Sequence, residues 1–188
     1  MHARLRLLLA APFLAACTSA PISPEDNWAG GADREPGSGT LHAMARLYAA
    51  QGRDAEAEAT LRSLVSSQPD FVPAYEELAR LYVRRNQIDG AIVALKLGLE
   101  RAPDDAVLLN DLGVCHLLHK DPAAAAEVFT RAASAAPDDA RPRANLALAL
   151  ALQGRTEEAL ALWQQVVPPA VAQANLELAT KVATPTKS

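Results

Sequence analysis

The stretch VPAYEELARLYVRRNQIDGAIVALKLGLERAPDD, residues 72–105, decides the fold of this chain. Its apolar residues recur at steps of three and four on either side of a polar turn, which predicts two amphipathic helices joined as a hairpin. Pro103 ends the second helix, because proline lacks the amide hydrogen that a continuing helix needs. Pro69 and Pro137 lie 34 residues before and after Pro103. A fixed period of this length is typical of a helical repeat array.

Four copies of the hairpin follow one another, at residues 38–71, 72–105, 106–139 and 140–173. Larger residues stand at positions 4, 7, 11 and 24 of each copy, where they fill the space around the point at which its two helices cross. Positions 8 and 20 hold small residues, which let the two backbones approach closely. These small residues are Ala45 and Ala57, Ala79 and Ala91, Gly113 and Ala125, and Ala147 and Ala159.

This register resembles the tetratricopeptide repeat family, whose pattern has the same apolar, small and proline positions. The resemblance implies an all-α fold, a solenoid of about four helical hairpins plus a C-terminal capping helix, within a repeat domain at residues 38–183. The fourth copy departs from the pattern, because Val171 stands where the family has proline.

The ends of the helices carry their own signals. Asp54 and Thr156 are expected to cap the second helices of the first and fourth copies, and Asp121 that of the third, with Pro122 at the first helical position. Pro168 and the proline after it stop the last repeat helix early. A capping helix is then expected at 170–183, followed by a frayed tail at 184–188. Its apolar residues are expected to cover the end of the array; they are Val171, Ala174, Leu178 and Val182.

Residues 1–17, MHARLRLLLAAPFLAAC, have the arginines and the short apolar run of a secretion signal. The ending Leu14-Ala15-Ala16-Cys17 resembles a bacterial lipobox. That resemblance implies a lipoprotein signal peptide at 1–16 and a covalent lipid on Cys17, with no other cofactor. An ordinary cleaved signal followed by a chance cysteine is the alternative.

Residues 17–37 then form a flexible tether, because they are rich in Pro, Gly, Ser and Ala and show no apolar period. Trp28 within it is a surface residue, a packing residue or a membrane-interface contact. Thr18 follows the cysteine where inner-membrane retention signals usually have aspartate. The resemblance therefore favours a lipid anchor in the outer membrane, at its periplasmic face.

Composition and residue pattern exclude several classes of function. A net charge of −4 gives no basic surface for nucleic acid. No group of nucleophile, base and orienting residue is present, so the chain is not expected to be an enzyme or to take a small-molecule substrate.

The run Cys115-His116-x-x-His119 is the one that resembles a metal or thiol site. Two ligands on one helix, with no second pair elsewhere, make a weak metal site. His116 stands at position 11, where the other copies have Tyr or Leu. We therefore expect all three residues to serve packing.

By the tetratricopeptide resemblance, the first helix of each copy lines a concave groove that suits an extended peptide or an amphipathic helix of a partner protein. The sequence places basic residues on one side of this groove and apolar residues towards the third and fourth copies. For any single member, a solvated helix face is the alternative. The groove residues implied are His42, Arg46, Glu76, Arg80, Val83, Arg84, Asn110, Asp111, Val114, Leu117, Arg141, Asn145 and Leu148.

Two segments raise a narrower resemblance: NLALALALQGR at 145–155 and VVPPAVAQANLEL at 166–178. They resemble the C-terminal end of the TadD-type lipoproteins of the tight-adherence pilus system. This implies a membrane-anchored, non-enzymatic scaffold that assists assembly of a pilus or secretion apparatus, with a secretin or pilus component as its protein partner. The alternative is a periplasmic adaptor that recruits peptidoglycan hydrolases, proteases or chaperones in envelope maintenance.

Overall fold

The computed structural model describes residues 36–183. The predicted signal peptide 1–16, the lipidated Cys17, nearly all of the tether and the tail 184–188 lie outside these residues. The described helices belong to one compact unit that begins at Gly37. No helix in the described residues is both long and apolar enough to cross a membrane.

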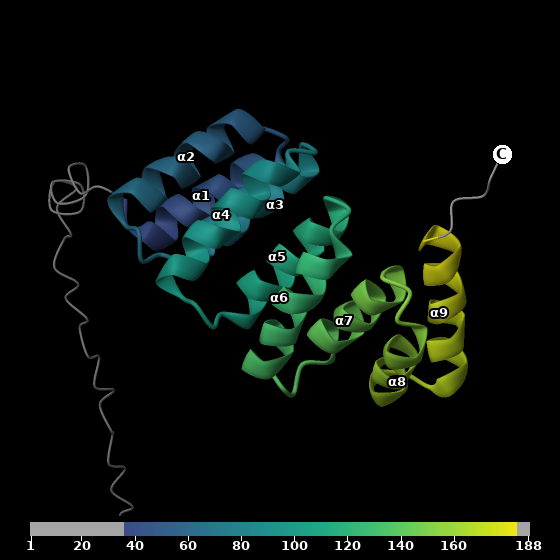
Figure 1. The fold of residues 1–188 in the computed structure, drawn as a ribbon. Coiled ribbons are helices and arrows are strands. Elements are labelled where there is room, and N and C mark those ends of the chain that lie inside the picture. Colours follow the sequence, from purple (N-terminus) through teal and green to yellow (C-terminus); the bar gives the residue numbers. More distant parts are fainter. Residues whose placement is uncertain (1–35, 184–188) are drawn as a thin grey trace, which may run out of the picture. The chain divides into compact units, whose positions relative to one another are not determined.

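Regular structure within residues 36–183 is entirely α-helical, which confirms the predicted fold class. The helices form four antiparallel hairpins, α1/α2 to α7/α8, followed by α9 (Figure 1). Their bounds are Ser38–Ala50 (α1), Asp54–Ser67 (α2), Pro73–Arg84 (α3), Ile88–Arg101 (α4), Ala106–Leu118 (α5), Pro122–Ala135 (α6), Ala140–Leu152 (α7), Thr156–Val166 (α8) and Pro169–Ala183 (α9).

Odd-numbered helices form one face of the solenoid and even-numbered helices the other. Each of α1, α3, α5 and α7 contacts the next odd helix as well as its neighbours in sequence. In contrast, no Cα atoms of α2 and α4, or of α6 and α8, come within 8 Å of each other. We call the first face, made by α1, α3, α5, α7 and α9, the inner face.

The predicted helix crossings are present, since all eight small residues at positions 8 and 20 are buried. Gly113 shows why size matters there. A Cβ atom added to it would lie 2.5 Å from Cε1 of Phe129, the residue that fills the same crossing from α6. The absence of a side chain at Gly113 therefore makes room for the Phe129 ring.

Each hairpin turns on one residue with positive φ, and this closes the first helix. Gly52, Asn86, Lys120 and Gly154 have φ of 74°, 56°, 63° and 80°. The sequence indicates the turns at Gly52, Asn86 and Gly154, but it does not reveal Lys120, because lysine has no preference for this conformation. The amide of the next residue then donates to the carbonyl at position 11, for example from Arg53 to Tyr48 at 2.9 Å.

That next residue is also the N-cap of the second helix, which corrects two predictions. The N-cap residues of α2 and α8 are Arg53 and Arg155, and neither makes a side-chain cap bond. Asp54 and Thr156 are the first helical residues instead, because the chain enters the helix directly after closing the turn. The prediction for Asp121 is confirmed, since its carboxylate accepts a hydrogen bond from the Ala124 amide at 3.0 Å.

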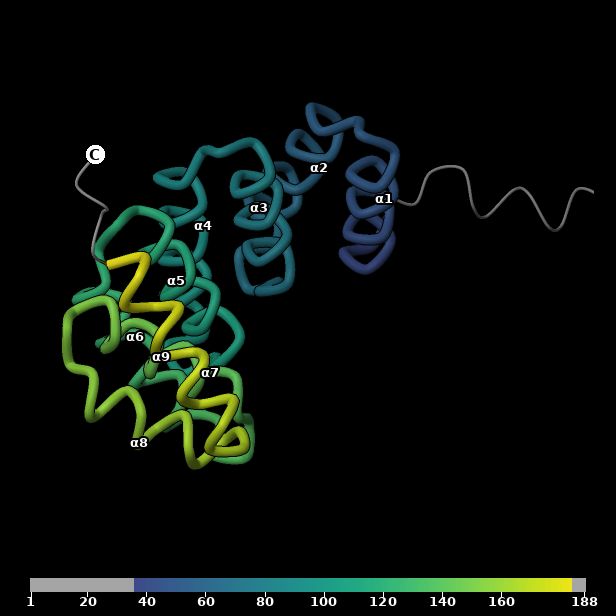
Figure 2. The backbone as a smooth tube through the Cα atoms, turned by 90° about the vertical axis from the view of Figure 1, so that its right-hand side faces the viewer, coloured from purple at the N-terminus to yellow at the C-terminus, as the bar shows by residue number. Residues whose placement is uncertain are grey.

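Helix α9 packs on α7 and α8 (Figure 2). It does so through a different face from the one predicted. Ala172 and Ala179 are its buried residues. The predicted stripe Val171, Ala174, Leu178 and Val182 is exposed. The alanines make the contact because their small side chains allow α9 to approach α7 and α8 closely. The larger apolar residues lie on the outside of the cap.

Candidate protein-binding groove

Two adjoining hollows lie along the inner face. The first, of about 400 Å³, opens between α3 and α5 and includes Arg80, Val83, Arg84 and Asp111 in its lining. The second, of about 660 Å³, opens over α7 between α5 and α9. Val114 lines both, so the two hollows adjoin at this residue, and we call them together the inner groove. The second hollow is lined by Val114, Leu117, Leu118, Ala144, Asn145, Leu148, Leu152, Trp163, Asn175, Leu178, Ala179 and Val182.

The structure thus brings together eight of the thirteen residues that the sequence places in a groove. These eight are Arg80, Val83, Arg84, Asp111, Val114, Leu117, Asn145 and Leu148. Five further predicted residues do not line either hollow: His42, Arg46, Glu76, Asn110 and Arg141.

Those five residues are held in contacts of their own. His42 packs edge-on against Phe71 with ring centroids 5.4 Å apart, and its buried Nε2 has no hydrogen-bond partner among the described residues. Arg46 pairs with Glu77 at 3.5 Å. The remaining three also have partners within the protein: Glu76 pairs with Arg80, Asn110 accepts a hydrogen bond from Asn145 at 2.8 Å, and Arg141 pairs with Asp139 at 2.7 Å.

The lining residues that the sequence-based prediction of the groove missed include Leu118, Leu152, Asn175, Leu178 and Val182. Leu118 and Leu152 stand at position 13 of their repeats, the position that Arg84 occupies in the second, so the register contained a signal for them. The α9 residues had no such signal, because the repeat pattern ends before α9.

The arginines near the first hollow do not form the open basic side that the sequence suggested. Arg80 pairs with both Glu76 and Glu77, the latter at 3.3 Å, and Arg84 pairs with Asp54 at 3.0 Å. Burial raises the pKa of the Glu76 carboxyl, while Arg80 opposes that rise. The charges at this end of the groove therefore compensate one another within the protein.

Asp111 differs from the other carboxylates near the first hollow, which are paired with arginines. It is half-buried, and it forms no ion pair with any residue in the range 36–183. Burial raises its pKa above the ordinary value; Arg80, a hydrogen bond from the Asn110 side chain, and Arg141 lower it in part. The groove thus holds one negative charge that this part of the protein does not pair.

The Cys115, His116 and His119 run offers no reactive site. Cys115 is buried, and burial followed by the charge of Asp111 raises its thiol pKa to about 11, so that the thiolate nucleophile is scarce at neutral pH. His116 is half-buried, and burial lowers its pKa. His119 differs from the prediction: it is exposed and lies 3.1 Å from the Asp89 carboxylate, so it serves no packing role. No three metal-binding side chains cluster anywhere in residues 36–183.

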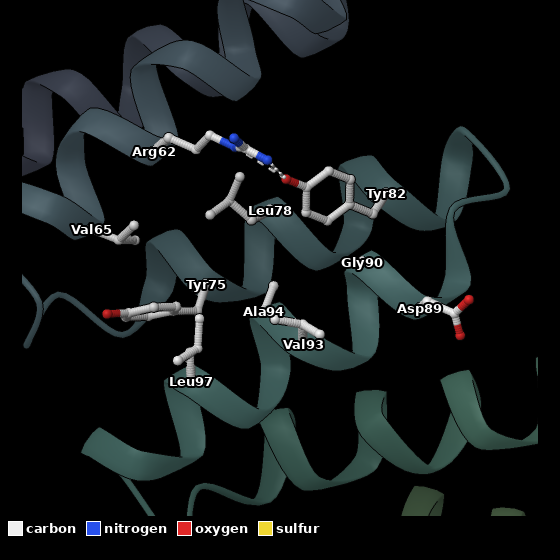
Figure 3. Close-up of a pocket in the computed structure, with 10 residues that line it drawn as sticks. All are labelled: Arg62, Val65, Tyr75, Leu78, Tyr82, Asp89, Gly90, Val93, Ala94 and Leu97. Atoms are coloured by element: carbon white, nitrogen blue, oxygen red, sulfur yellow. Dashed lines mark hydrogen bonds between the residues drawn. The ribbon is translucent and has the colours of Figure 1, made fainter.

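A separate cleft of about 480 Å³ lies on the opposite face, between α2 and α4 over α3 (Figure 3). Tyr75, Leu78 and Tyr82 are its residues on α3. Arg62 of α2 reaches across and donates a hydrogen bond of 2.9 Å to the Tyr82 hydroxyl (Figure 3). That hydroxyl in turn donates to Glu58 at 3.0 Å. This hydrogen-bond network joins α2 to α3 at the cleft, where α2 and α4 do not contact each other.

The geometry agrees with the comparisons to known proteins. Three models of the tetratricopeptide repeat match, at residues 39–81, 76–140 and 116–179. The chain is a tetratricopeptide repeat protein. Repeats of this family typically serve as non-enzymatic scaffolds for protein interactions and bind no cofactor.

Solved tetratricopeptide structures share the fold at low sequence identity. YrrB, "a TPR protein with an unusual peptide-binding site", superposes with a TM-score of 0.65 at 19% identity, over 78% of this chain and 76% of that one. A MamA protein gives 0.66 at 16% identity, over 78% and 80%. TTC0263, a thermophilic TPR protein of Thermus thermophilus, gives 0.60 at 22% identity, over 78% and 81%. No curated protein matches the sequence.

Proposed function

We propose that this tetratricopeptide repeat protein is a lipid-anchored, non-enzymatic scaffold that holds a segment of a partner protein in its inner groove. The observation that carries the proposal is the pair of adjoining hollows that extends from α3 to α9, the second of which is lined by no charged residue. Apolar surface of this kind, in a concave setting, is typical of sites that bind protein segments.

The exposure of the lining supports a binding role over a packing role. Leu118, Leu178 and Val182 are 51%, 65% and 68% exposed, although each is large and apolar. Exposed residues of this size gathered in one hollow leave apolar surface in water that a partner would cover. The peptide-binding site of YrrB, a protein of the same fold, is consistent with such a role.

The cellular setting in this proposal comes from the sequence. The lipobox-like Leu14-Ala15-Ala16-Cys17 would anchor the chain in the outer membrane at its periplasmic face. The two C-terminal segments that resemble TadD-type lipoproteins suggest a partner in pilus or secretion assembly, a secretin or a pilus component. Blocking lipidation with Cys17→Ser should release the chain from the membrane fraction; retention of the variant there would exclude this anchor.

The groove is tested by affinity capture from envelope extract. Leu178→Glu places a charge in the second hollow at an exposed position, so the fold should persist. Val93→Glu is the matched control, because Val93 is 57% exposed on α4, at the cleft of the opposite face. We expect one dominant partner to be lost with Leu178→Glu and kept with Val93→Glu.

Equal capture by wild type and both variants would show that binding lies outside the inner groove. The identity of the captured protein then separates two settings. A secretin or pilus component supports the assembly role, whereas a peptidoglycan hydrolase, protease or chaperone supports an adaptor in envelope maintenance.

A further inference from the structure

Three of the inner helices, α5, α7 and α9, repeat one pattern where they line the groove. Asp111, Val114 and Leu118 stand at i, i+3 and i+7 on α5, a spacing that puts all three on one helix face. The same spacing recurs with Asn145, Leu148 and Leu152 on α7 and with Asn175, Leu178 and Val182 on α9. Each of these helices therefore presents one polar residue followed by two apolar ones.

These patterns are aligned across the groove. Short connections make successive helices run antiparallel, so α5, α7 and α9 run in the same sense. All nine residues line the two adjoining hollows. Along α5, α7 and α9 the groove consequently has a polar edge near the middles of the helices and an apolar edge towards their ends.

The polar edge contains a single ionisable group, Asp111. Asn145 is already bonded to Asn110, and Asn175 carries no charge. The cations nearest to Asp111 are engaged elsewhere, Arg80 by Glu76 and Glu77, and Arg141 by Asp139. A half-buried carboxylate without a cation is unfavourable, and a cation from a ligand would relieve that cost.

We propose that the groove binds an amphipathic helix that lays an uncharged apolar stripe on the rows of α5, α7 and α9 and pairs a Lys or Arg with Asp111. The proposal rests on the proposed function and deepens it. A helix fits because it offers apolar residues at the same three- and four-residue steps as the groove. The unpaired Asp111 sets the charge of the partner residue that lies over the polar edge.

The test is a selection for binders on the full chain. The probe is a library of displayed helices of about 18 residues, roughly five turns, with a fixed leucine stripe and randomised polar positions. We expect Lys or Arg to be enriched at one position that borders the stripe. Replacing that residue by Gln in a selected peptide should weaken binding about tenfold, as expected for loss of a charge-assisted hydrogen bond.

Two variants of the chain isolate the role of Asp111. With Asp111→Asn the enrichment should vanish, and the Lys and Gln peptides should bind equally. Asp138→Asn, at an exposed residue outside the groove, should leave the preference unchanged. Asp111→Asn should melt no lower than wild type at neutral pH, because burial raises the pKa of Asp111 and its ionised form opposes folding there.

Several results would overturn the inference. In the selection, these are enrichment of acidic residues or equal binding of peptides with a leucine stripe and with a scrambled one. In the variant, it is an unchanged preference of Asp111→Asn for Lys over Gln peptides. A further one is self-association of the chain that Leu178→Glu abolishes, with no binding of any helix. A different result would contradict the proposed function: the Leu178→Glu variant would capture the same partner from envelope extract as the wild type. If Leu178→Glu loses the partner in the envelope capture and the selection yields no helical binder, the groove remains the binding site but its ligand is not an amphipathic helix.

Discussion

Single residues at the helix crossings are held by contacts that leave little freedom in side-chain size. Gly113→Ala adds a Cβ atom 2.5 Å from the Phe129 ring, which is itself fully buried and cannot withdraw. We expect the variant to lose about 1–3 kcal/mol in the free energy of unfolding, the usual cost of overpacking. That loss should exceed the gain of about 0.5–1 kcal/mol from replacing glycine within a helix. Urea unfolding followed by circular dichroism measures the difference.

Gly90→Ala is the matched control for this prediction. Its added Cβ would meet the Tyr82 ring at 3.3 Å, and that ring lies at the edge of the outer cleft with room to shift by a few tenths of an ångström. Helix propensity should then dominate, leaving stability unchanged or slightly raised. Equal destabilisation by the two substitutions would show that the crossing at Gly113 is no tighter than an ordinary contact.

Among whole elements, α9 has the most unusual distribution of apolar residues, and two adjacent positions test it. Ala179 is 3% exposed against the array, whereas Leu178 beside it is 65% exposed. Ala179→Gln should cost about 1–3 kcal/mol, because a larger polar side chain must enter a packed contact. Leu178→Gln should change stability by no more than about 0.5 kcal/mol. Thermal unfolding of both variants measures this, and the reverse order would mean that α9 packs through its larger residues.

Helix α9 shows which features of the fold and the groove could be predicted from the sequence and which could not. Prolines spaced by 34 residues and small residues at the crossings were sufficient for the fold class. Most of the groove residues on α3, α5 and α7 came from the tetratricopeptide resemblance that this register carries. Neither the spacing nor the resemblance could settle α9, because this helix has two apolar stripes. Hydrophobicity favours the stripe of Val171 and Leu178, while close packing favours the alanines. The charge state of the groove was also hidden, because the partners of Arg84 and Arg46 come from other helices of the array.

Across the whole solenoid, contacts reach only neighbouring repeats, so stability is expected to be local. One buried cluster runs from Ala45 of α1 to Cys115 of α5, and a second runs from Ala125 of α6 to Ala179 of α9. In an array of this kind, each repeat is stabilised by its own packing and by the interfaces with its neighbours. Loss of a terminal element should therefore weaken the nearest repeat most.

A chain that ends at Val167, without α9, tests this locality. It would uncover the packing of α9 on α7 and α8, where Trp163 is buried and donates a hydrogen bond to the Ala144 carbonyl at 3.1 Å. Amide hydrogen exchange should then become faster in α7 and α8 while α3 and α4 keep their protection. A chain that ends at Ala183 keeps α9 and should exchange like the full chain. Uniform loss of protection from α1 to α8 would instead show that the array unfolds as one cooperative unit, with the groove and its far end stabilised together.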